Sequence, residues 1–588
     1  MMCSNSRLQT ALSGTVYVMS VLFICDTIKS KECDLQLTEK LKDRSVVFRN
    51  IDMKFCQLAC VKDCFVFASC RLRDETEKTK EYNAVTNGRP LSHPNVTTGI
   101  CGSTVCNDTS QCVVKGCEMV CLEAPPLCDL HNASKIGDLS RVNAILSQRR
   151  ANIDCQKWIG RTPVMLAALK GHREVVELLV TKGANVKLID KFGINILHLA
   201  CLGGDRDVVK YILSRDMTYI DDIAQCKRTP MMLAAENGHE EVVELLLNEG
   251  ANMSLVDDGR NNILHLACER GHLEVVKYIV SQNKVDINSR GWKKRTPVME
   301  AAKNGHKKVV EFLVEHGGDL SLVGYSGVNI LHLACRGGHL EVVKYIVSQN
   351  KVAINSRGWK KRTPVMEAAK NGHKKVVEFL VEHGGDLSLV GYSGVNILHL
   401  ACRGGHLEVV KYIVSQNKVA INSRGWKKRT PVMEAATNGH KKVVEFLVEH
   451  GGDLSLVYYG GGNILHLACE GGHLEVVKYI VSQNKVDINS RGWKKRTPVM
   501  EAATNGHKNV VEFLVEHGGD LSLVYYGGGN ILHLACEGGH LEVVKYIVSQ
   551  NKVDINSRGW KKRTPVMEAA KNGHKKVVEF LVSKGADV

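Results

Sequence analysis

Most of the chain carries apolar residues with the spacing of short amphipathic helices. Val309, Val310, Phe312 and Leu313 fall on one face of such a helix, and Lys and Glu occupy the other faces. The helix before it is expected to start after Thr296, a residue type that caps helix N-termini. It is expected to end at Gly305, which tolerates a left-handed backbone. The pattern predicts a unit of helix, turn, helix and extended loop.

This unit recurs with a period of 67 residues, which holds two related half-units of 33 and 34 residues. Thr-Pro opens one half-unit at Thr162, Thr229, Thr296, Thr363, Thr430, Thr497 and Thr564. Asn-Ile-Leu-His-Leu-Ala-Cys opens the other at Asn195, Asn262, Asn329, Asn396, Asn463 and Asn530. Residues 291–357 are identical to residues 358–424, and residues 425–491 differ from residues 492–558 only in having Lys442 where the second copy has Asn509. Such copies indicate an array lengthened by duplication.

These half-units resemble the ankyrin repeat over residues 128–588, with about fourteen repeats in all. The motifs that carry the resemblance are Thr162-Pro163, Gly171-His172, Val175-Val176, Leu178-Leu179 and Gly183-Ala184-Asn185. The resemblance implies a mainly α fold, an α-solenoid of antiparallel helix pairs with β-hairpin fingers. The sequence departs from the family at Met299, where ankyrin repeats usually carry histidine, whereas the Asn-Ile half-units keep it, as at His198.

The N-terminal part has a different composition, because thirteen of the 21 cysteines precede residue 129. Residues 1–27 have the features of a signal peptide: Arg7, an apolar run from Ala11 to Cys25, and charged residues after it. The run is shorter than a membrane-spanning helix needs, and no later segment is long and apolar enough to span a bilayer. We therefore expect a secreted chain without a membrane span. The alternative is an uncleaved segment and a cytoplasmic protein.

Residues 28–121 form a predicted disulfide-bonded module, followed by a linker at 122–127 that contains Pro125 and Pro126. The spacing of Cys56 to Cys70 looks helical and is similar to a PAN/apple module. A zinc site is the competing interpretation, but no pair of Cys-x-x-Cys motifs is present. The ten disulfide candidates are Cys33, Cys56, Cys60, Cys64, Cys70, Cys101, Cys106, Cys112, Cys117 and Cys121, and the glycosylation candidates are Asn95 and Asn107.

Histidine and cysteine also recur within the repeats, and this regularity argues against catalysis. Twenty-three of the 24 histidines occupy repeated positions, such as His306, His316 and His332, which indicates structural roles. Equivalent cysteines two repeats apart should lie about 20 Å from each other, too far for a disulfide, so we expect buried thiols. No acid pair, nucleophile with a base, or phosphate-binding loop stands apart from the repeat. The sequence predicts no enzyme, no cofactor and no metal site.

The predicted finger tips alternate between a basic type centred on tryptophan and an uncharged type centred on tyrosine. The alternative to a binding role is that each tryptophan packs on a neighbouring finger or stacks on its own lysines. Exposed Trp, Tyr and Arg favour binding hot spots, so we predict a contact ridge. Its candidate residues are Arg290, Trp292, Lys293, Lys294, Arg295, Tyr325, Arg357, Trp359, Lys360, Lys361, Arg362, Tyr392, Trp426, Tyr458, Tyr459, Trp493 and Trp560.

The net charge of +16 is concentrated in two of the repeated units. Residues 291–357 carry ten basic and five acidic residues, as does their copy, whereas residues 425–491 carry eight and seven. The sequence therefore predicts a non-catalytic binding protein with an acidic protein partner, contacted through the fingers and the concave helix face. A secreted effector or toxin is the alternative. Nucleic-acid binding fits less well because acidic residues alternate with the lysines and no reading motif is present.

Overall fold

A computed structural model describes the backbone of residues 56–61, 64–72, 80–83, 110–115, 118–123, 127–148, 152–157 and 159–588. The predicted signal segment 1–27 lies outside these residues, as do Cys33, Cys101, Cys106, Cys117, Asn95, Asn107 and Trp158. The chain forms two compact units, residues 1–263 and 264–588, and each is described separately.

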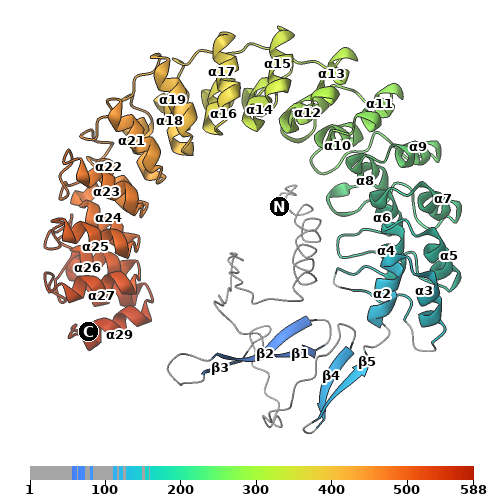
Figure 1. The fold of residues 1–588 in the computed structure, drawn as a ribbon, viewed down its shortest axis with the longest axis horizontal. Helices are drawn as coiled ribbons and strands as arrows, with labels where there is room; N and C mark the ends of the chain where they lie inside the picture. The colour runs from blue at the N-terminus through green and yellow to red at the C-terminus, as the bar shows by residue number, and fades with distance from the viewer. Residues whose placement is uncertain are drawn as a thin grey trace, which may run out of the picture. The chain divides into compact units, whose positions relative to one another are not determined.

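The described part of the cysteine-rich region consists of antiparallel strands (Figure 1). One sheet has the order β1 (Cys56–Val61), β2 (Cys64–Leu72), β3 (Lys80–Asn83), and a second pairs β4 (Ser110–Lys115) with β5 (Glu118–Glu123). The helical interpretation of the Cys56 to Cys70 spacing is therefore wrong. The register places Cys56 opposite Cys70 and Cys112 opposite Cys121.

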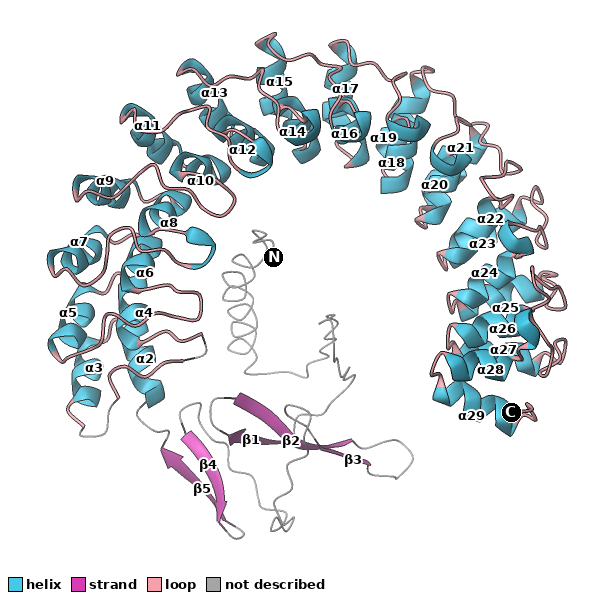
Figure 2. Cartoon of the chain, turned by 180° about the vertical axis from the view of Figure 1, so that it is seen from behind, coloured by secondary structure: helices cyan, strands magenta, loops and turns pink. Residues whose placement is uncertain are grey.

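Residues 127–588, where described, form 28 α-helices in fourteen antiparallel pairs, which confirms the predicted α-solenoid (Figure 2). The pairs of the first unit are α2 (Leu127–Ile136) with α3 (Leu139–Leu146), α4 (Pro163–Leu169) with α5 (Arg173–Thr181), α6 (Ile196–Gly203) with α7 (Arg206–Ser214), and α8 (Pro230–Asn237) with α9 (Glu240–Asn248). Helix α10 (Ile263–Arg270) begins at the last residue of this unit and pairs with α11 (Leu273–Ser281).

In the second unit the first helices of successive repeats pack against one another as a layer, and the second helices form another layer outside it (Figure 1). The first helices are α12 (Pro297–Asn304), α14 (Ile330–Gly337), α16 (Pro364–Lys370), α18 (Ile397–Gly404), α20 (Pro431–Thr437), α22 (Ile464–Glu470), α24 (Pro498–Thr504), α26 (Ile531–Glu537) and α28 (Pro565–Lys571). The second helices are α13 (Lys307–Glu315), α15 (Leu340–Ser348), α17 (Lys374–Glu382), α19 (Leu407–Ser415), α21 (Lys441–Glu449), α23 (Leu474–Ser482), α25 (Lys508–Glu516), α27 (Leu541–Ser549) and α29 (Lys575–Ser583).

The two kinds of half-unit cap their first helices differently. Asn329 forms a capping box. Its side-chain oxygen accepts a hydrogen bond from the His332 backbone N–H, and the His332 ring accepts one from the Asn329 backbone N–H. Thr296 occupies the predicted N-cap position, but its buried hydroxyl has no hydrogen-bond partner. The predicted helix end at Gly305 is confirmed, with φ of 87°. The hydroxyls of Thr363, Thr430 and Thr497 are likewise without a partner, so proline geometry and packing hold these helix starts, whereas Thr162, Thr229 and Thr564 accept from the backbone as ordinary N-caps.

The core runs between the two helix layers and contains the side chains that the apolar pattern predicted. Val309, Val310 and Leu313 of α13 are buried, and Phe312 is half-buried. Cys335 of α14 and its equivalents in the other Asn-Ile half-units are fully buried in the same layer. Because each repeat contributes the same residues, burial of one apolar face repeats along the array.

The predicted β-hairpin fingers are tight turns with little strand structure. In the second unit the tyrosine-centred fingers are closed by one antiparallel bridge each, as between Val323 and Asn329. The tryptophan-centred fingers are closed by a hydrogen bond from the Gly291 amide to the Arg295 carbonyl oxygen (2.8 Å) and its equivalents. Single-turn 3₁₀ segments form most tips: η2 (Gln225–Lys227) in the first unit, and η3 (Trp292–Lys294), η4 (Tyr325–Gly327), η5 (Trp359–Lys361), η6 (Tyr392–Gly394), η7 (Trp426–Lys428), η8 (Trp493–Lys495) and η9 (Trp560–Lys562) in the second.

Candidate interaction surface

Five finger tips of the second unit present the same exposed sequence, Trp-Lys-Lys, which we call the basic tips. Their tryptophans are 41–59% exposed, a large fraction for an indole. Both lysines of each basic tip are exposed as well. The basic tips are Trp292–Lys294, Trp359–Lys361, Trp426–Lys428, Trp493–Lys495 and Trp560–Lys562.

The two lysines of each basic tip have a left-handed backbone, which side chains other than glycine and asparagine rarely adopt. Lys293 and Lys294 both have φ of 56°, and the other four basic tips have values between 54° and 59°. At the second of these positions the tyrosine-centred tips carry glycine, Gly327 in one copy and Gly461 in another, and at the first they carry Ser326 or Gly460. The basic tips therefore place charged side chains where the backbone favours glycine.

The tryptophans also make local contacts of the kind that the alternative interpretation expected. The first lysine of each tip lies over the ring of its own tryptophan, with the Lys360 ammonium 4.5 Å from the Trp359 ring centroid and Lys293 5.7 Å from that of Trp292. Such contacts contribute about 0.5–1 kcal/mol at exposed sites. They hold the indole in place while leaving about half of it accessible.

The tyrosine-centred tips divide into an exposed and a covered residue. Tyr325, Tyr392 and Tyr459 occupy the tip position and are 65–71% exposed. Tyr458 instead lies half-buried in its finger, with the Arg429 guanidinium 5.6 Å from its ring centroid. Burial, followed by the nearby Glu501 and Glu470 carboxylates, raises the pKa of Tyr458 to about 12. Tyr458 is thus a structural residue of the finger.

The arginines that flank the basic tips are held by the protein itself. Arg290 donates to the carbonyl oxygen of Val323 in the next finger (2.7 Å), and Arg357 donates to that of Val390 (2.8 Å). Arg295 pairs with Glu300 (3.2 Å), and the buried Arg362 lies 3.5 Å from Glu367 in the same arrangement. These four guanidinium groups link neighbouring elements and are less available to a partner than the lysines.

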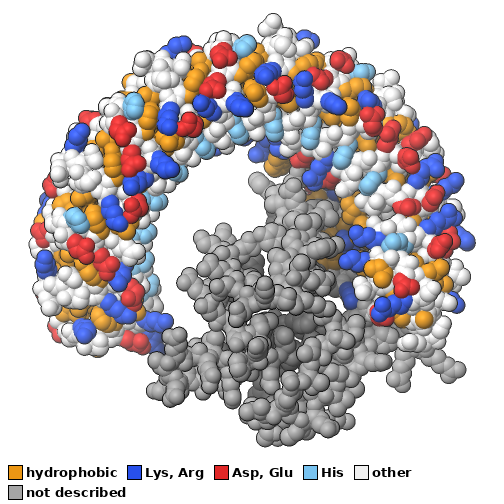
Figure 3. Space-filling view, in the orientation of Figure 1, with side chains coloured by type: hydrophobic (Ala, Val, Ile, Leu, Met, Phe, Trp, Pro, Cys, Tyr) orange, Lys and Arg blue, Asp and Glu red, His pale blue; other side chains and the backbone are white. Residues whose placement is uncertain are grey.

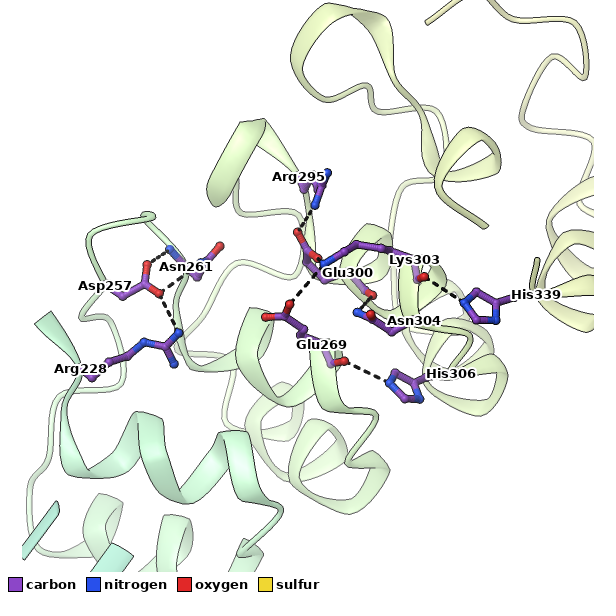
Figure 4. A network of polar contacts seen from close by, with 10 residues as sticks. All are labelled: Arg228, Asp257, Asn261, Glu269, Arg295, Glu300, Lys303, Asn304, His306 and His339. Carbon is purple, nitrogen blue, oxygen red and sulfur yellow. Dashed lines mark hydrogen bonds and ion pairs between the residues drawn. The ribbon is translucent and has the colours of Figure 1, made fainter. Parts of the chain in front are cut away.

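A glutamate in the first helix of the Thr-Pro half-units of the second unit organises a polar network that sequence reasoning missed, as Glu300 does in Figure 4. Glu300 is buried between Arg295 and Lys303, and the Lys303 ammonium also lies 3.2 Å from Glu269 of the preceding repeat. The signal for it was present, because Glu recurs three residues after every later Thr-Pro, at a position next to alanines that are buried.

In the first unit a comparable network has a different composition. Arg228 is buried and pairs with Glu236 (2.7 Å) and with Asp257 (3.3 Å), which also accepts from the Asn261 amide (3.2 Å) (Figure 4). A buried charge needs such compensation, because an unpaired one would carry a large desolvation penalty.

The repeated histidines have structural contacts, as their regular positions predicted. His306 occupies the N-cap position of α13 without a side-chain cap hydrogen bond, and its Nε2 donates to the carbonyl oxygen of Glu269 in the preceding repeat (3.1 Å). His332 is buried, and its Nε2 donates to the carbonyl oxygen of Arg362 in the following repeat (2.9 Å). Burial lowers the pKa of His332. Histidine side chains recur along the inner edge of the second unit (Figure 3), where they link successive repeats.

The thiols of the Asn-Ile half-units are unsuited to chemistry. Burial raises the pKa of each of them above its usual range, so they remain protonated. They are Cys201, Cys268, Cys335, Cys402, Cys469 and Cys536, and all six are reduced.

The described residues contain neither a metal-ligand cluster nor a spanning helix. Among these residues no group of three His, Cys, Asp or Glu side chains is arranged to hold a metal ion. Within the same part of the chain, every helix is too short or too polar to cross a bilayer.

The chain belongs to the ankyrin repeat family. A family model described as "Ankyrin repeats (3 copies)" matches residues 130–222, 217–291, 289–357, 365–458, 417–492, 433–525 and 520–588. Ankyrin repeats mediate protein–protein interaction and generally serve as non-catalytic scaffolds, so the class of function follows from the family.

Relatives of this chain are long proteins of several kinds. Alpha-latrocrustotoxin-Lt1a of Latrodectus tredecimguttatus is 27% identical over 51% of this chain, and the match spans 22% of the toxin. The human transient receptor potential cation channel subfamily A member 1 is 25% identical over 70% of this chain and 35% of the channel. The ankyrin repeat and KH domain-containing protein mask-1 of Caenorhabditis elegans is 30% identical over 66% of this chain and 15% of its own length.

Among solved structures, the human ASB11 ankyrin repeat domain matches 39% of this chain over its whole length, with 25% identity and a TM-score of 0.35. This chain matches only part of each of the three protein relatives named above, between 15% and 35% of their length.

Proposed function

We propose that this protein is a non-catalytic binding protein whose basic tips contact an acidic protein partner. The observation that carries the proposal is the backbone of those tips. Two lysines of each tip have φ near 55°, a conformation that costs about 1 kcal/mol for a residue with a side chain. Glycine would remove that cost, as it does at Gly460 and Gly461, yet all five basic tips carry lysine. Strain kept at a surface turn is typical of a functional site.

The tryptophan of each basic tip supplies the second half of the contact. Half-exposed indoles that are held by a neighbouring lysine lose little conformational freedom when a partner covers them. Trp and Tyr also dominate the energetics of many protein interfaces. The lysines would attract acidic groups and raise the association rate, and the indoles would supply the buried contact.

The proposal is tested with the triple variant in which Trp292, Trp359 and Trp426 become alanine. Wild-type protein is used to capture partners from the extract of its native tissue, which are identified by mass spectrometry and purified. We expect the variant to bind the purified partner at least about tenfold more weakly, with an unchanged circular dichroism spectrum. Lys442→Asn is the matched control, because the chain itself carries Asn509 at the equivalent position. Equal affinity of wild type and triple variant would refute the role of the tips.

We further propose that the protein is secreted and acts as an effector outside its cell. The predicted signal at 1–27 and the likeness to two toxins of Latrodectus tredecimguttatus, at 27% and 26% identity, support this proposal. N-terminal sequencing of the native protein tests secretion, and a glycosidase shift tests Asn95 and Asn107. Retention of Met1 together with an unshifted band would overturn it. Binding of the purified protein to target-cell membranes then tests the effector role.

A further inference from the structure

The first helices of the second unit carry one glutamate per 67-residue period, buried in the first three copies and half-buried in the last two, and the cations around it vary from copy to copy. These five glutamates, which we call the ladder carboxylates, are Glu300, Glu367, Glu434, Glu501 and Glu568. Each is followed three residues later by a position on the same helix: Lys303, Lys370, Thr437, Thr504 and Lys571. The first helix of the preceding repeat contributes a third position: Glu269, Arg336, Arg403, Glu470 and Glu537.

Around the first ladder carboxylate the charges balance. Glu300 accepts ion pairs from Arg295 and Lys303, and Lys303 also neutralises Glu269. Two cations therefore face two carboxylates, and Figure 4 shows the four side chains turned towards one another. A partner carboxylate would find no cation in excess here.

Around the second ladder carboxylate the cations are in excess. Glu367 is buried and lies 3.1 Å from the Arg336 guanidinium and 3.5 Å from that of Arg362. Lys370 is exposed at the end of the same helix. The positive charge of Arg403 in the next repeat repels the Lys370 ammonium, and Arg403 itself pairs with Glu434 at 2.9 Å. Burial, followed by the positive charges of Arg362, Arg336 and Arg403, lowers the pKa of Lys370. The side chains of Arg336 and Arg403 are both partly exposed.

Around the fifth ladder carboxylate the charges balance again, because Arg563 and Lys571 both pair with Glu568 and Glu537 occupies the third position. Around the fourth ladder carboxylate, Glu501, the sign is reversed. Glu470 occupies the position that Arg403 has in the preceding copy. Burial first, and then the Glu470 carboxylate, raises the pKa of Glu501. Among the described residues Arg496, at 3.6 Å, is the one cation paired with Glu501. Thr437 replaces the lysine. The excess of positive charge is thus restricted to α14, α16 and α18, which are consecutive first helices.

We propose that Arg336, Lys370 and Arg403 form a binding site for the carboxylates of an acidic segment of the protein partner. This inference rests on the proposed function, because it gives the same partner a second contact on the helix face. An acidic peptide fits better than a nucleic acid, since the buried Glu367 and Glu434 lie against Arg336 and Arg403 and would repel a continuous phosphate backbone. Spaced carboxylates can meet the cations individually, and arginine binds them with two parallel hydrogen bonds.

The test uses the full-length protein and a fluorescein-labelled peptide of glutamate and alanine, followed by anisotropy at two salt concentrations. The double variant Lys370→Thr with Arg403→Glu installs the residues that the chain already carries at Thr437 and Glu470, so the substitutions suit the fold. We expect about tenfold weaker binding than wild type at low salt. The converse variant, Thr437→Lys with Glu470→Arg, should bind the peptide more tightly than wild type.

Two outcomes would overturn the inference: affinity of the double variant within twofold of wild type, or tighter binding of a single-stranded RNA of equal charge. Lys442→Asn, which removes one charge outside both proposed contacts and installs the residue that the chain carries at Asn509, is the matched control and should keep most of the affinity for the peptide. The outcome also separates the two proposals. Suppose that the triple tryptophan variant no longer binds the native partner, whereas the double variant still binds the peptide. The helix-face site is then refuted and the proposed role of the basic tips is supported.

Discussion

Replacing the second lysine of each basic tip by glycine should stabilise the protein, although it removes five positive charges. The five substitutions are Lys294→Gly, Lys361→Gly, Lys428→Gly, Lys495→Gly and Lys562→Gly. Each of these lysines has φ between 54° and 59°. The cation–π contact of each tip comes from the first lysine, such as Lys293, and is retained.

The magnitude follows from two opposing backbone terms. Replacing a left-handed lysine by glycine removes its backbone strain and stabilises the folded state by about 1 kcal/mol per tip. The larger freedom of glycine in the unfolded chain costs about 0.5–1 kcal/mol. The net gain is therefore about 0.3 kcal/mol per tip, or roughly 1–2 kcal/mol for five tips, because contributions in a repeat array nearly add.

Urea unfolding followed by circular dichroism measures this gain. We expect the five-glycine variant to unfold at a higher midpoint than wild type, and Lys442→Asn, which changes charge without changing a tip, to unfold at the wild-type midpoint. The same variant should bind the native partner more weakly, with a smaller salt dependence. A lower unfolding midpoint would show that the lysines are there for stability and would refute the argument from strain.

Three further outcomes are expected. Thr296→Val should change the free energy of unfolding by less than about 0.5 kcal/mol, because the Thr296 hydroxyl is unpaired. Asn329→Ala should lower it by about 1 kcal/mol through loss of the capping box. Equal costs in urea unfolding would contradict the difference in capping. Burial lowers the pKa of His466 to about 4, below its ordinary value of 6.5, so its contribution is complete above pH 6.5 and is lost as the pH falls towards 4. The urea midpoint should fall over that range, by less in His466→Gln, and an equal fall in both proteins would exclude this histidine. Cys335 should react with a thiol reagent only in denaturant, since its thiol is buried and protonated; labelling of the native protein would contradict that burial.

The repeat arithmetic and the apolar spacing predicted the solenoid because each repeat is stabilised by contacts with its neighbours, and those contacts are encoded in a short period. The helix ends at Gly305 and Pro297 followed from local backbone preference alone. The sequence was wrong about the helical character of Cys56 to Cys70, where the spacing of cysteines says little about backbone pairing. It also placed Tyr458 with the exposed tip residues, although the residue after it, Tyr459, occupies the tip.

The sequence by itself determined the family, the number and limits of the helices, and the position of the tryptophans at finger tips, because these depend on periodicity and local turn chemistry. Only the tertiary structure decided which charges are available. Arg295 and Lys294 are neighbours in sequence, yet one pairs with Glu300 and the other faces solvent with a strained backbone. Lys370 gains its neighbours Arg336 and Arg403 from repeats on either side. The charges around Lys370 depend on distances between residues more than thirty positions apart, and those distances are set by how the repeats stack.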